Sequence, residues 1–427
     1  MHRPTVFATR LLTVTLLAGA MPLSAQTTDP NLAHARRLLA QTILIDGHND
    51  LPWEIRTAKD APMDVAAYDL RTTTKGMTDF ARLAAGEVGG QFWSIYIPGE
   101  IKDSGFARVQ LEQFDIARRM VERYPDRLTL ALTADDIVKA KKQKKIASLL
   151  GMEGGHAIEN SLGALRAYYD LGARYMTLTH NVTLDWADAA LGEPTHGGLT
   201  PFGKEVVREM NRLGMLVDLS HVAPSVMSDA LDVAQAPVIF SHSSARAIVD
   251  HPRNVPDSIL ARLPKNGGVV MVTFVPGFIS NAVRDYEGAA DSVRQALSKA
   301  PGDSAERRAQ YRAWRSAHPA PKATIADVAD HIDHIRKVAG VDHVGIGSDF
   351  DGIEAGPEGL EDVSKFPALF AELIRRGWTD ADLKKLAGEN VLRALRQAEV
   401  VAARLQKERQ PSTATIAKLD APGAGVP

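Results

Sequence analysis

The amino-acid sequence predicts an α/β fold with one architecture, a (β/α)8 TIM barrel. Eight short apolar segments alternate with helical segments along most of the chain, which is the order of elements in such barrels. Ligand-type polar residues directly follow six of these segments, as at the carboxyl-terminal rim of a barrel. A doubly wound sheet would call for a glycine-rich turn after the first strand, but His48-Asn49-Asp50 stands there. The barrel is therefore favoured.

The expected elements follow from short apolar runs for strands and from longer amphipathic runs for helices. The helix after the second strand, for example, has an apolar stripe of Val109, Phe114, Ile116 and Met120. The predicted strands are 42–45, 90–97, 146–152, 175–179, 215–220, 237–241, 269–274 and 343–348. The predicted helices are 31–41, 103–124, 202–213, 325–339, 366–376 and 379–401.

The catalytic barrel is predicted to span residues 31–402 as a single domain. A segment at about 281–321, rich in Ala, Arg and Ser, interrupts the alternation and is interpreted as a helical surface insertion. The tail at 408–427 is rich in Pro, Ala, Thr and Gly, which predicts disorder.

Composition excludes several classes of protein. The 427 residues are 45% hydrophobic and 24% charged, as is usual for a globular protein. A formal net charge of −2 gives no reason to expect nucleic acid or an anionic membrane as partner. Cysteine is absent, which excludes disulfides, thiolate zinc sites and a cysteine nucleophile.

The first 25 residues have the pattern of a secretory signal peptide. Arg3 and Arg10 precede a mostly apolar run, 11–20, and Pro22-Leu23-Ser24-Ala25 ends in a small residue. This pattern predicts cleavage after Ala25. The run is too short to span a bilayer comfortably, so an uncleaved anchor is the less favoured alternative. We expect an exported bacterial protein, periplasmic or secreted, with no membrane anchor after processing.

Imidazole and carboxylate side chains at the predicted strand ends indicate a metal centre. His48 and Asp50 are two positions apart, so in extended backbone both point to one side. Glu153 follows the third strand, His221 the fifth and His242 the sixth. A single histidine beside a strand is more often structural, but five such residues at one rim are hard to explain in that way. Without cations, the two carboxylates would repel each other.

The number and type of these residues favour two zinc ions. Three histidines and two carboxylates exceed the three protein ligands of one catalytic zinc and suit two ions about 3.5–4 Å apart. We expect Glu153 to bridge them, with His48 and Asp50 on one ion and His221 and His242 on the other. Nitrogen-rich ligation without thiolates favours zinc over Mn, Co or Fe. Because two ions sharing a water lower its pKa, a barrel of the metal-dependent hydrolase type is predicted.

Seven motifs occur in order between about residues 40 and 397. They are Asp46-Gly47-His48-Asn49-Asp50-Leu51-Pro52, Gly151-Met152-Glu153-Gly154, Leu178-Thr179-His180-Asn181, Asp218-Leu219-Ser220-His221, Ser241-His242-Ser243, His251-Pro252-Arg253-Asn254-Val255 and Gly347-Ser348-Asp349-Phe350-Asp351-Gly352. Together they resemble the renal (membrane) dipeptidase family of zinc peptidases. The resemblance implies a barrel with two zinc ions that cleaves dipeptides, often including those with a C-terminal D-residue. Some members also open the lactam of carbapenem-like compounds.

The resemblance implies the same five metal ligands and adds three residues. His180 would contact the substrate carbonyl or the tetrahedral oxyanion. Arg253 would bind the substrate's C-terminal carboxylate, for which a guanidinium fork is suited. Asp349 would move a proton from the bridging water to the leaving amine. The alternatives are a surface salt bridge for Arg253 and a helix N-cap for Asp349.

The chain departs from some members of that family. Mammalian relatives have cysteines that link subunits and a C-terminal lipid-anchor signal, neither of which is found here. A dimer is common in the family, so a homodimer stays open. At 274–278 the sequence Phe-Val-Pro-Gly-Phe replaces a tyrosine-containing stretch of some relatives, which puts a hydroxyl contact from that loop in doubt.

Two other functions stay open. The first is another two-metal barrel amidohydrolase that acts on N-acyl amino acids or lactams. The second is a non-catalytic exported binding protein, which is disfavoured because every ligand position and Asp349 are filled.

Overall fold

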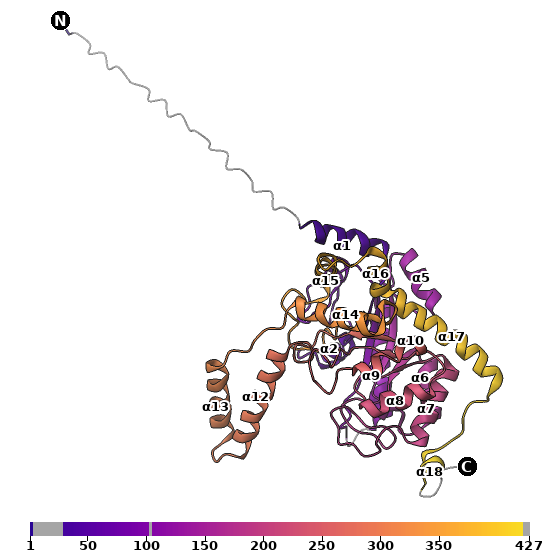
Figure 1. The fold of residues 1–427 in the computed structure, drawn as a ribbon. Coiled ribbons are helices and arrows are strands. Elements are labelled where there is room, and N and C mark those ends of the chain that lie inside the picture. The colour runs from indigo at the N-terminus through magenta and orange to yellow at the C-terminus, as the bar shows by residue number, and fades with distance from the viewer. Residues whose placement is uncertain (3–28, 102–104, 422–427) are drawn as a thin grey trace.

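The described residues form one parallel sheet that closes into a barrel. The computed structural model describes residues 1, 2, 29–101 and 105–421. Their nine strands follow the order β2-β1-β9-β8-β7-β6-β5-β4-β3, and β2 also pairs with β4, which closes a ring of eight (Figure 1). The strands are β1 (Leu44–Asn49), β2 (Val88–Tyr96), β3 (Leu128–Leu130), β4 (Ile146–Glu153), β5 (Ala173–Thr177), β6 (Leu216–Asp218), β7 (Ile239–Phe240), β8 (Val269–Val272) and β9 (Val344–Ile346). The predicted (β/α)8 barrel is therefore confirmed.

Helices lie between the strands and cover the outside of the barrel (Figure 1). They are α1 (Pro30–Gln41), α2 (Leu51–Thr57), α3 (Phe80–Ala85), α4 (Phe106–Arg123), α5 (Ala134–Lys142), α6 (Leu162–Asp170), α7 (Pro201–Leu213), α8 (Pro224–Val233), α9 (Asp257–Leu260), α10 (Leu263–Asn266), α11 (Pro276–Ile279), α12 (Asn281–Lys299), α13 (Ser304–Ala317), α14 (Ile325–Ala339), α15 (Phe366–Arg375), α16 (Asp380–Lys384), α17 (Asn390–Glu408) and α18 (Ile416–Leu419). Short 3-10 turns lie at Gly155–Ile158, Val341–His343 and Val363–Lys365, and a π turn at Lys385–Glu389 joins α16 to α17.

Strand β3 is the one strand that the sequence does not predict. It has three residues and pairs only with the beginning of β4, where Leu128 faces Ile146. It therefore lies outside the closed ring of eight strands and is not a ninth strand of the barrel. The apolar run is too short to stand out against the turn at 125–127 that precedes it.

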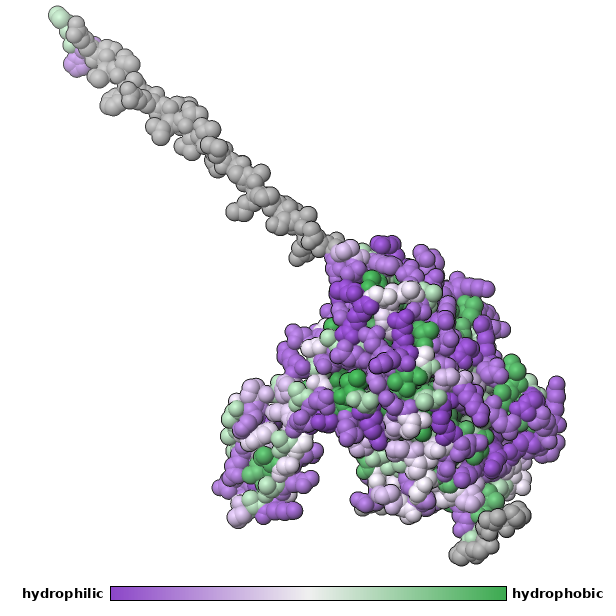
Figure 2. Space-filling view, in the orientation of Figure 1, coloured by the Kyte–Doolittle hydropathy of each residue, from purple (hydrophilic) through white to green (hydrophobic). Residues whose placement is uncertain are grey.

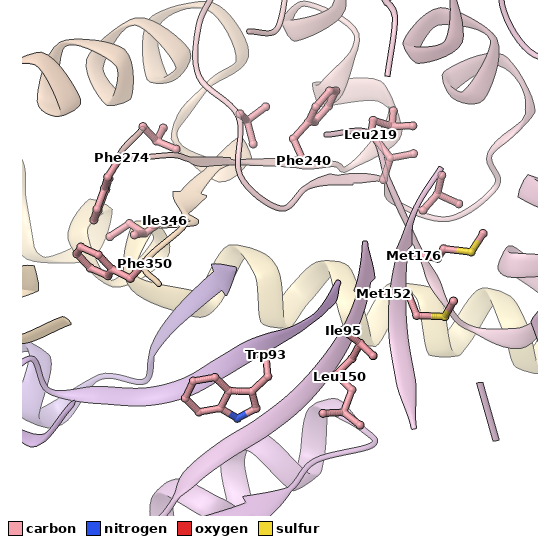
Figure 3. Close-up of a cluster of buried hydrophobic side chains, with 14 of the residues drawn as sticks. Trp93, Ile95, Leu150, Met152, Met176, Leu219, Phe240, Phe274, Ile346 and Phe350 are labelled. Atoms are coloured by element: carbon pink, nitrogen blue, oxygen red, sulfur yellow. The ribbon is translucent and has the colours of Figure 1, made fainter. Parts of the chain in front are cut away.

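Alternate residues of the barrel strands belong to two separate cores. Phe92 and Leu149 lie in one buried cluster together with Ile45, Ile239 and Met271. Their neighbours Trp93 and Leu150 lie in the larger cluster between the strands and the helices, part of which is seen in Figure 3. Because strand side chains alternate between faces, both faces are apolar, as the near-continuous apolar runs require.

The segment predicted as an insertion forms two antiparallel helices, α12 and α13, that project from the barrel (Figure 1). We call residues 281–317 the arm. Val283 and Ala290 are buried in α12, and no residue of α13 is buried. Tyr286 and Trp314 stack with ring centroids 5.7 Å apart. Figure 2 shows mostly hydrophilic residues on the arm, with a few hydrophobic ones between them.

The two ends of the chain differ in what the structure describes. Apart from residues 1 and 2, the predicted signal peptide at 1–25 lies outside the described residues. The tail was expected to be disordered from 408, yet Arg409 pairs with Glu205 and α18 packs against α7. The expectation of disorder therefore does not describe residues 409–421, which long-range polar contacts hold in place.

Asp420 gives this packed tail a measurable role. Its carboxylate accepts hydrogen bonds from Thr200 Oγ1 at 2.7 Å and Phe202 N at 2.9 Å, at the first turn of α7. An anion at a helix N-terminus pairs with unsatisfied N–H groups and with the helix dipole. We expect Asp420→Ala to lower the free energy of unfolding by about 1 kcal/mol, as measured by urea denaturation. Asp420→Asn, which keeps one acceptor oxygen, should lose less, and equal losses would contradict this account.

Candidate metal centre and substrate cavity

The structure brings all eight predicted site residues to one end of the barrel. His48 lies in β1 and Asp50 directly after it, and Glu153 is the last residue of β4. His180, His221, His242 and Asp349 follow β5, β6, β7 and β9, and Arg253 lies in the loop after β7. Six of the eight line one cavity of about 360 Å³, namely Asp50, Glu153, His180, His221, Arg253 and Asp349. His48 and His242 are buried beside it.

Two of these side chains start from backbone that non-glycine residues seldom adopt. The φ angle is 69° at His221 and 68° at Asp349. Left-handed backbone of this kind has a cost in free energy and is concentrated at functional sites. At these two residues the chain leaves the extended conformation of the strand, and both side chains line the cavity.

Glu153 lies at the centre of the cluster. Its Oε1 is 3.0 Å from His221 Nε2 and 3.4 Å from His242 Nε2. Its Oε2 is 3.4 Å from His48 Nε2, which is in turn 3.2 Å from Asp50 Oδ2. One carboxylate oxygen thus faces each side of the cluster.

The three buried histidines use their Nδ1 atoms in other hydrogen bonds. His48 Nδ1 lies 2.9 Å from the hydroxyl of Tyr175, and His221 Nδ1 lies 2.9 Å from Asn181 Oδ1. His242 Nδ1 lies 2.8 Å from Ser241 Oγ. Each ring therefore turns its Nε2 atom toward Glu153, which is the orientation that metal-binding histidines take from such partners.

Tyr175 reaches His48 because Gly151 leaves room for its ring. A Cβ atom on Gly151 would lie 2.0 Å from Tyr175 Cζ. The Tyr175 hydroxyl donates to Gly47 O at 3.3 Å, so its oxygen accepts from the Nδ1–H group of His48. When the ring is neutral, as a metal ligand must be, the Nε2 atom of His48 therefore carries no proton, and it has no hydrogen-bond partner among the described residues.

The residues present fit a metal centre. The Nε2 atoms of His221 and His242 are 2.9 Å apart. Because both rings donate through Nδ1, neither Nε2 carries a proton, so two lone pairs face each other and a shared cation would relieve the repulsion. Nitrogen ligands of one tetrahedral zinc lie about 3.3 Å apart for Zn–N bonds of about 2.0–2.1 Å.

Three groups of side chains each bring their possible ligand atoms within 4.8 Å of one another. They are His48 with Glu153 and His242, Glu153 with His180 and His221, and His48 with Asp50 and Asp349. Glu153 and His48 each belong to two groups, so the cluster is larger than a single ion requires.

The electrostatics of the cluster favour bound positive charge. Without a bound cation, burial opposes the charge of His48, but the carboxylates of Glu153 and Asp50 outweigh it and raise the pKa of His48 well above its usual value. Burial would raise the pKa of Glu153, but the positive charge of a protonated His48 outweighs this effect and lowers the pKa well below its usual value. Burial, with Asp50 and Glu153 adding to it against His48 and Arg253, raises the pKa of Asp349 to about 8.

The histidines on the other side are held neutral. Burial lowers the pKa of His221 and of His242 well below the usual value, and the charge of Arg253 adds to both effects. Burial also lowers the pKa of His180. Neutral imidazole is the form that binds a metal or donates a single hydrogen bond.

Arg253 is a buried cation without a carboxylate partner. Its side chain is 2% exposed, and within the described residues it makes no ion pair and its Nη1 atom has no hydrogen-bond partner. Nη2 donates to His242 O at 3.4 Å, and the guanidinium lies 5.5 Å from the centre of the Phe278 ring. The surface salt bridge considered for Arg253 is therefore absent, and burial lowers the pKa of Arg253 to about 10.

Aromatic and aliphatic side chains form the rest of the cavity wall. Trp53 and Tyr96 meet edge to face 4.9 Å apart, and Tyr96 lies 4.9 Å from the ring of His180. Leu191, Val275, Phe278 and Ile353 complete the apolar lining. Tyr96, Tyr175, Asn181 and Ser241 were not identified as site residues from the sequence. Only Asn181 and Ser241 carry a signal, since each adjoins a site histidine.

Comparisons with known proteins agree with these features. The model of the membrane dipeptidase family (peptidase family M19) matches residues 32–409. The chain is 40% identical over 390 residues to dipeptidase verJ of Clonostachys rogersoniana, covering 89% of this chain and 90% of that protein. In the part of the chain that the structure describes, no helix has both the length and the apolar character to cross a membrane.

Two solved structures of similar fold carry related names. One is the probable dipeptidase PvdM from Pseudomonas aeruginosa, with a TM-score of 0.76, 25% identity, and coverage of 87% of this chain and 99% of that one. The other is a metallo peptidase from Rhodobacter sphaeroides liganded with a phosphinate mimic of the dipeptide L-Ala-D-Ala. Its TM-score is 0.69 at 25% identity, with coverage of 84% and 99%. The chain thus belongs to the membrane dipeptidase family and is a metallo-dipeptidase, a hydrolase that acts on the peptide bonds of dipeptides.

Proposed function

We propose that this metallo-dipeptidase works with two zinc ions and accepts dipeptides with an L- or a D-residue at the C-terminal position. Glu153 would lie between the ions, with His48 and Asp50 on one and His221 and His242 on the other. The observation that carries the proposal is the buried guanidinium of Arg253, which makes no ion pair within the described residues and lines the same cavity as Asp50, Glu153 and His221. A fixed anion site next to a metal centre selects substrates whose free carboxylate is close to the scissile bond.

The size and lining of the cavity fit a dipeptide. About 360 Å³ is at the lower end of small-molecule sites. Its apolar walls, Trp53 and Tyr96 on one side and Val275 and Phe278 among the others, offer surfaces for two side chains. The phosphinate mimic of L-Ala-D-Ala bound by the Rhodobacter sphaeroides relative supports acceptance of a C-terminal D-residue.

The chain's own residues would divide the reaction as follows. Arg253 holds the substrate carboxylate through two parallel hydrogen bonds. His180, neutral and at the cavity wall, donates to the oxygen of the scissile carbonyl as negative charge develops on it. Asp349 accepts a proton from the attacking water and transfers it to the leaving amine. When bound, the two metal ions would activate the water and polarise the carbonyl.

The test is hydrolysis of an L-L and an L-D dipeptide by protein loaded with zinc, before and after treatment with a chelator. We expect both peptides to be cleaved, two zinc ions per chain by elemental analysis, and loss of activity with the metal. An N-acetyl amino acid, which offers the same carboxylate to Arg253 but has no free amino group, is the comparison substrate for the alternative amidohydrolase function. Failure of the zinc-loaded protein to cleave any dipeptide, or cleavage of the N-acetyl amino acid alone, would contradict the proposal.

Arg253→Ala should separate substrate binding from chemistry. Loss of a charge-assisted bidentate contact costs roughly 1.5–3 kcal/mol, so kcat/KM for dipeptides should fall by about 10- to 150-fold, mainly through KM. The matched control is a dipeptide with a C-terminal amide, which lacks the carboxylate. The wild type should have a much higher kcat/KM for the free acid than for the amide, whereas the variant should have similar kcat/KM values for the two substrates. A variant that still prefers the acid would place the carboxylate elsewhere.

A further inference from the structure

Two groups of three adjacent strands, separated in the ring by β8 on one side and β4 on the other, carry the same hydrogen-bond arrangement. In the first, Asp46 on β1 accepts from Ser348 beyond β9, through N to Oδ1 at 2.7 Å and Oγ to Oδ2 at 2.6 Å. In the second, Asp218 on β6 accepts from Ser241 beyond β7, through N to Oδ1 at 2.8 Å and Oγ to Oδ2 at 2.6 Å. We call each arrangement a clamp. All four side chains are fully buried.

The two clamps agree in further detail. In each, Oδ1 also accepts from the backbone N–H two residues along, that of His48 at 3.4 Å or of Ser220 at 3.1 Å. Oδ2 also accepts from a side chain of the strand on the other side, Gln91 on β2 at 3.0 Å or Thr177 on β5 at 2.5 Å. Each carboxylate thus ties three adjacent strands together, with hydrogen bonds of the stronger, charge-assisted kind.

Each clamped serine directly precedes a residue of the site. Ser241 is followed by His242, and Ser348 by Asp349. Because a clamp engages both the N–H and the hydroxyl of its serine, it fixes the backbone from which the next side chain leaves. Both clamps therefore fix the direction in which the next side chain, that of His242 or Asp349, leaves the backbone.

The two serine oxygens differ in what they accept. Ser241 gives its proton to Asp218, so its oxygen accepts from the Nδ1–H group of His242 at 2.8 Å. This leaves His242 Nε2 unprotonated and directed at Glu153. Ser348 Oγ instead accepts from Phe350 N at 3.2 Å, and Asp349 N donates to His48 O at 3.1 Å. That pair of bonds closes the turn in which Asp349 has its left-handed backbone.

We propose that each clamp orients one side chain of the site, and that the two clamps serve different steps. The Asp218–Ser241 clamp sets the ring of His242 for metal binding, and the Asp46–Ser348 clamp sets Asp349 for proton transfer. The inference rests on the proposed function, since it assigns the two clamps to the metal ligands and the proton carrier respectively.

The test compares Ser241→Ala with Ser348→Ala. Ser241→Ala should weaken zinc affinity by about 10- to 100-fold, measured by competition with a chromogenic chelator, and excess zinc should restore most of kcat. Ser348→Ala should keep zinc affinity within about threefold, while kcat of the fully loaded enzyme falls by about 100-fold and its pH profile shifts. Loss of a structural hydrogen bond alone would change neither zinc affinity nor the pH profile.

Matched variants separate these outcomes from general destabilisation. Ser148→Ala removes a buried hydroxyl of β4 that has no hydrogen-bond partner among the described residues, and it should change neither property. Ser241→Thr and Ser348→Thr keep the hydroxyl and should recover most of what the alanine variants lose. If both alanine variants lose the same property, or neither differs from Ser148→Ala, the inference is overturned. If the wild type itself binds no zinc, the proposed function fails instead.

Discussion

Replacement of Glu153 by glutamine should abolish dipeptide hydrolysis and leave the purified protein with fewer than two metal ions per chain. Glutamine has nearly the same shape but no charge, and its amide NH2 would face either His48 or the pair His221 and His242, all of which lie within 3.4 Å of the carboxylate. Loss of a central ligand removes both charge compensation and metal-based activation. We expect kcat/KM to fall by on the order of 10³-fold or more.

Metal content and activity should be measured on the same preparations. Ser148→Ala is a suitable control, since it removes a hydroxyl on β4, the strand of Glu153, that has no hydrogen-bond partner among the described residues, and it should keep both ions. Circular dichroism would show that the barrel of each variant is intact. A Glu153→Gln protein that keeps two zinc ions and a tenth of wild-type activity would show that the carboxylate is not the bridge.

Asp349→Asn should reduce kcat by about 10²- to 10⁴-fold, the range for loss of a general acid or base, while the protein keeps its metal. Asp349 lies at the cavity with Oδ1 4.0 Å from His48 Nε2, but it caps no helix of the described residues, so the alternative role as an N-cap is absent. Burial raises the pKa of this carboxyl group to about 8, and perturbed pKa values of this kind are concentrated at functional sites.

The control for Asp349 is Asp342→Asn, at the opposite end of β9. Asp342 pairs with Lys385 at 2.7 Å, where both side chains are partly exposed, so its loss should not affect kcat. Asp349→Asn protein with full activity would move the proton transfer to another group. Loss of metal in step with activity would instead make Asp349 a ligand, in line with its place beside His48 and Asp50.

The barrel and the clustering of the site could be predicted because both follow from local pattern. Apolar runs of strand length, each ended by a polar residue, are enough to place His48, Glu153, His221 and His242 at one rim. The spacing of His48 and Asp50 also leads to the right outcome, although β1 ends at Asn49 and Asp50 already begins the turn into α2. Their side chains still meet, at 3.2 Å.

The supporting contacts could not be predicted, because they join residues far apart in sequence. Tyr175 and His48 are 127 positions apart, and Ser348 and Asp46 are 302 apart. No local pattern marks a buried serine or tyrosine as the partner of a particular histidine or aspartate. The packing of Asp420 on α7 was missed for the same reason, since composition indicates only that the tail has few apolar residues to bury.

The arm offers a place from which the protein can be observed. The chain contains no cysteine, so a single thiol introduced near the tip of the arm, as in Ser298→Cys, would be the only thiol in the chain. Ser298 is exposed near the end of α12, and the arm contributes little to the buried core. A fluorophore or surface tether attached there would report on, or immobilise, the molecule in a known orientation.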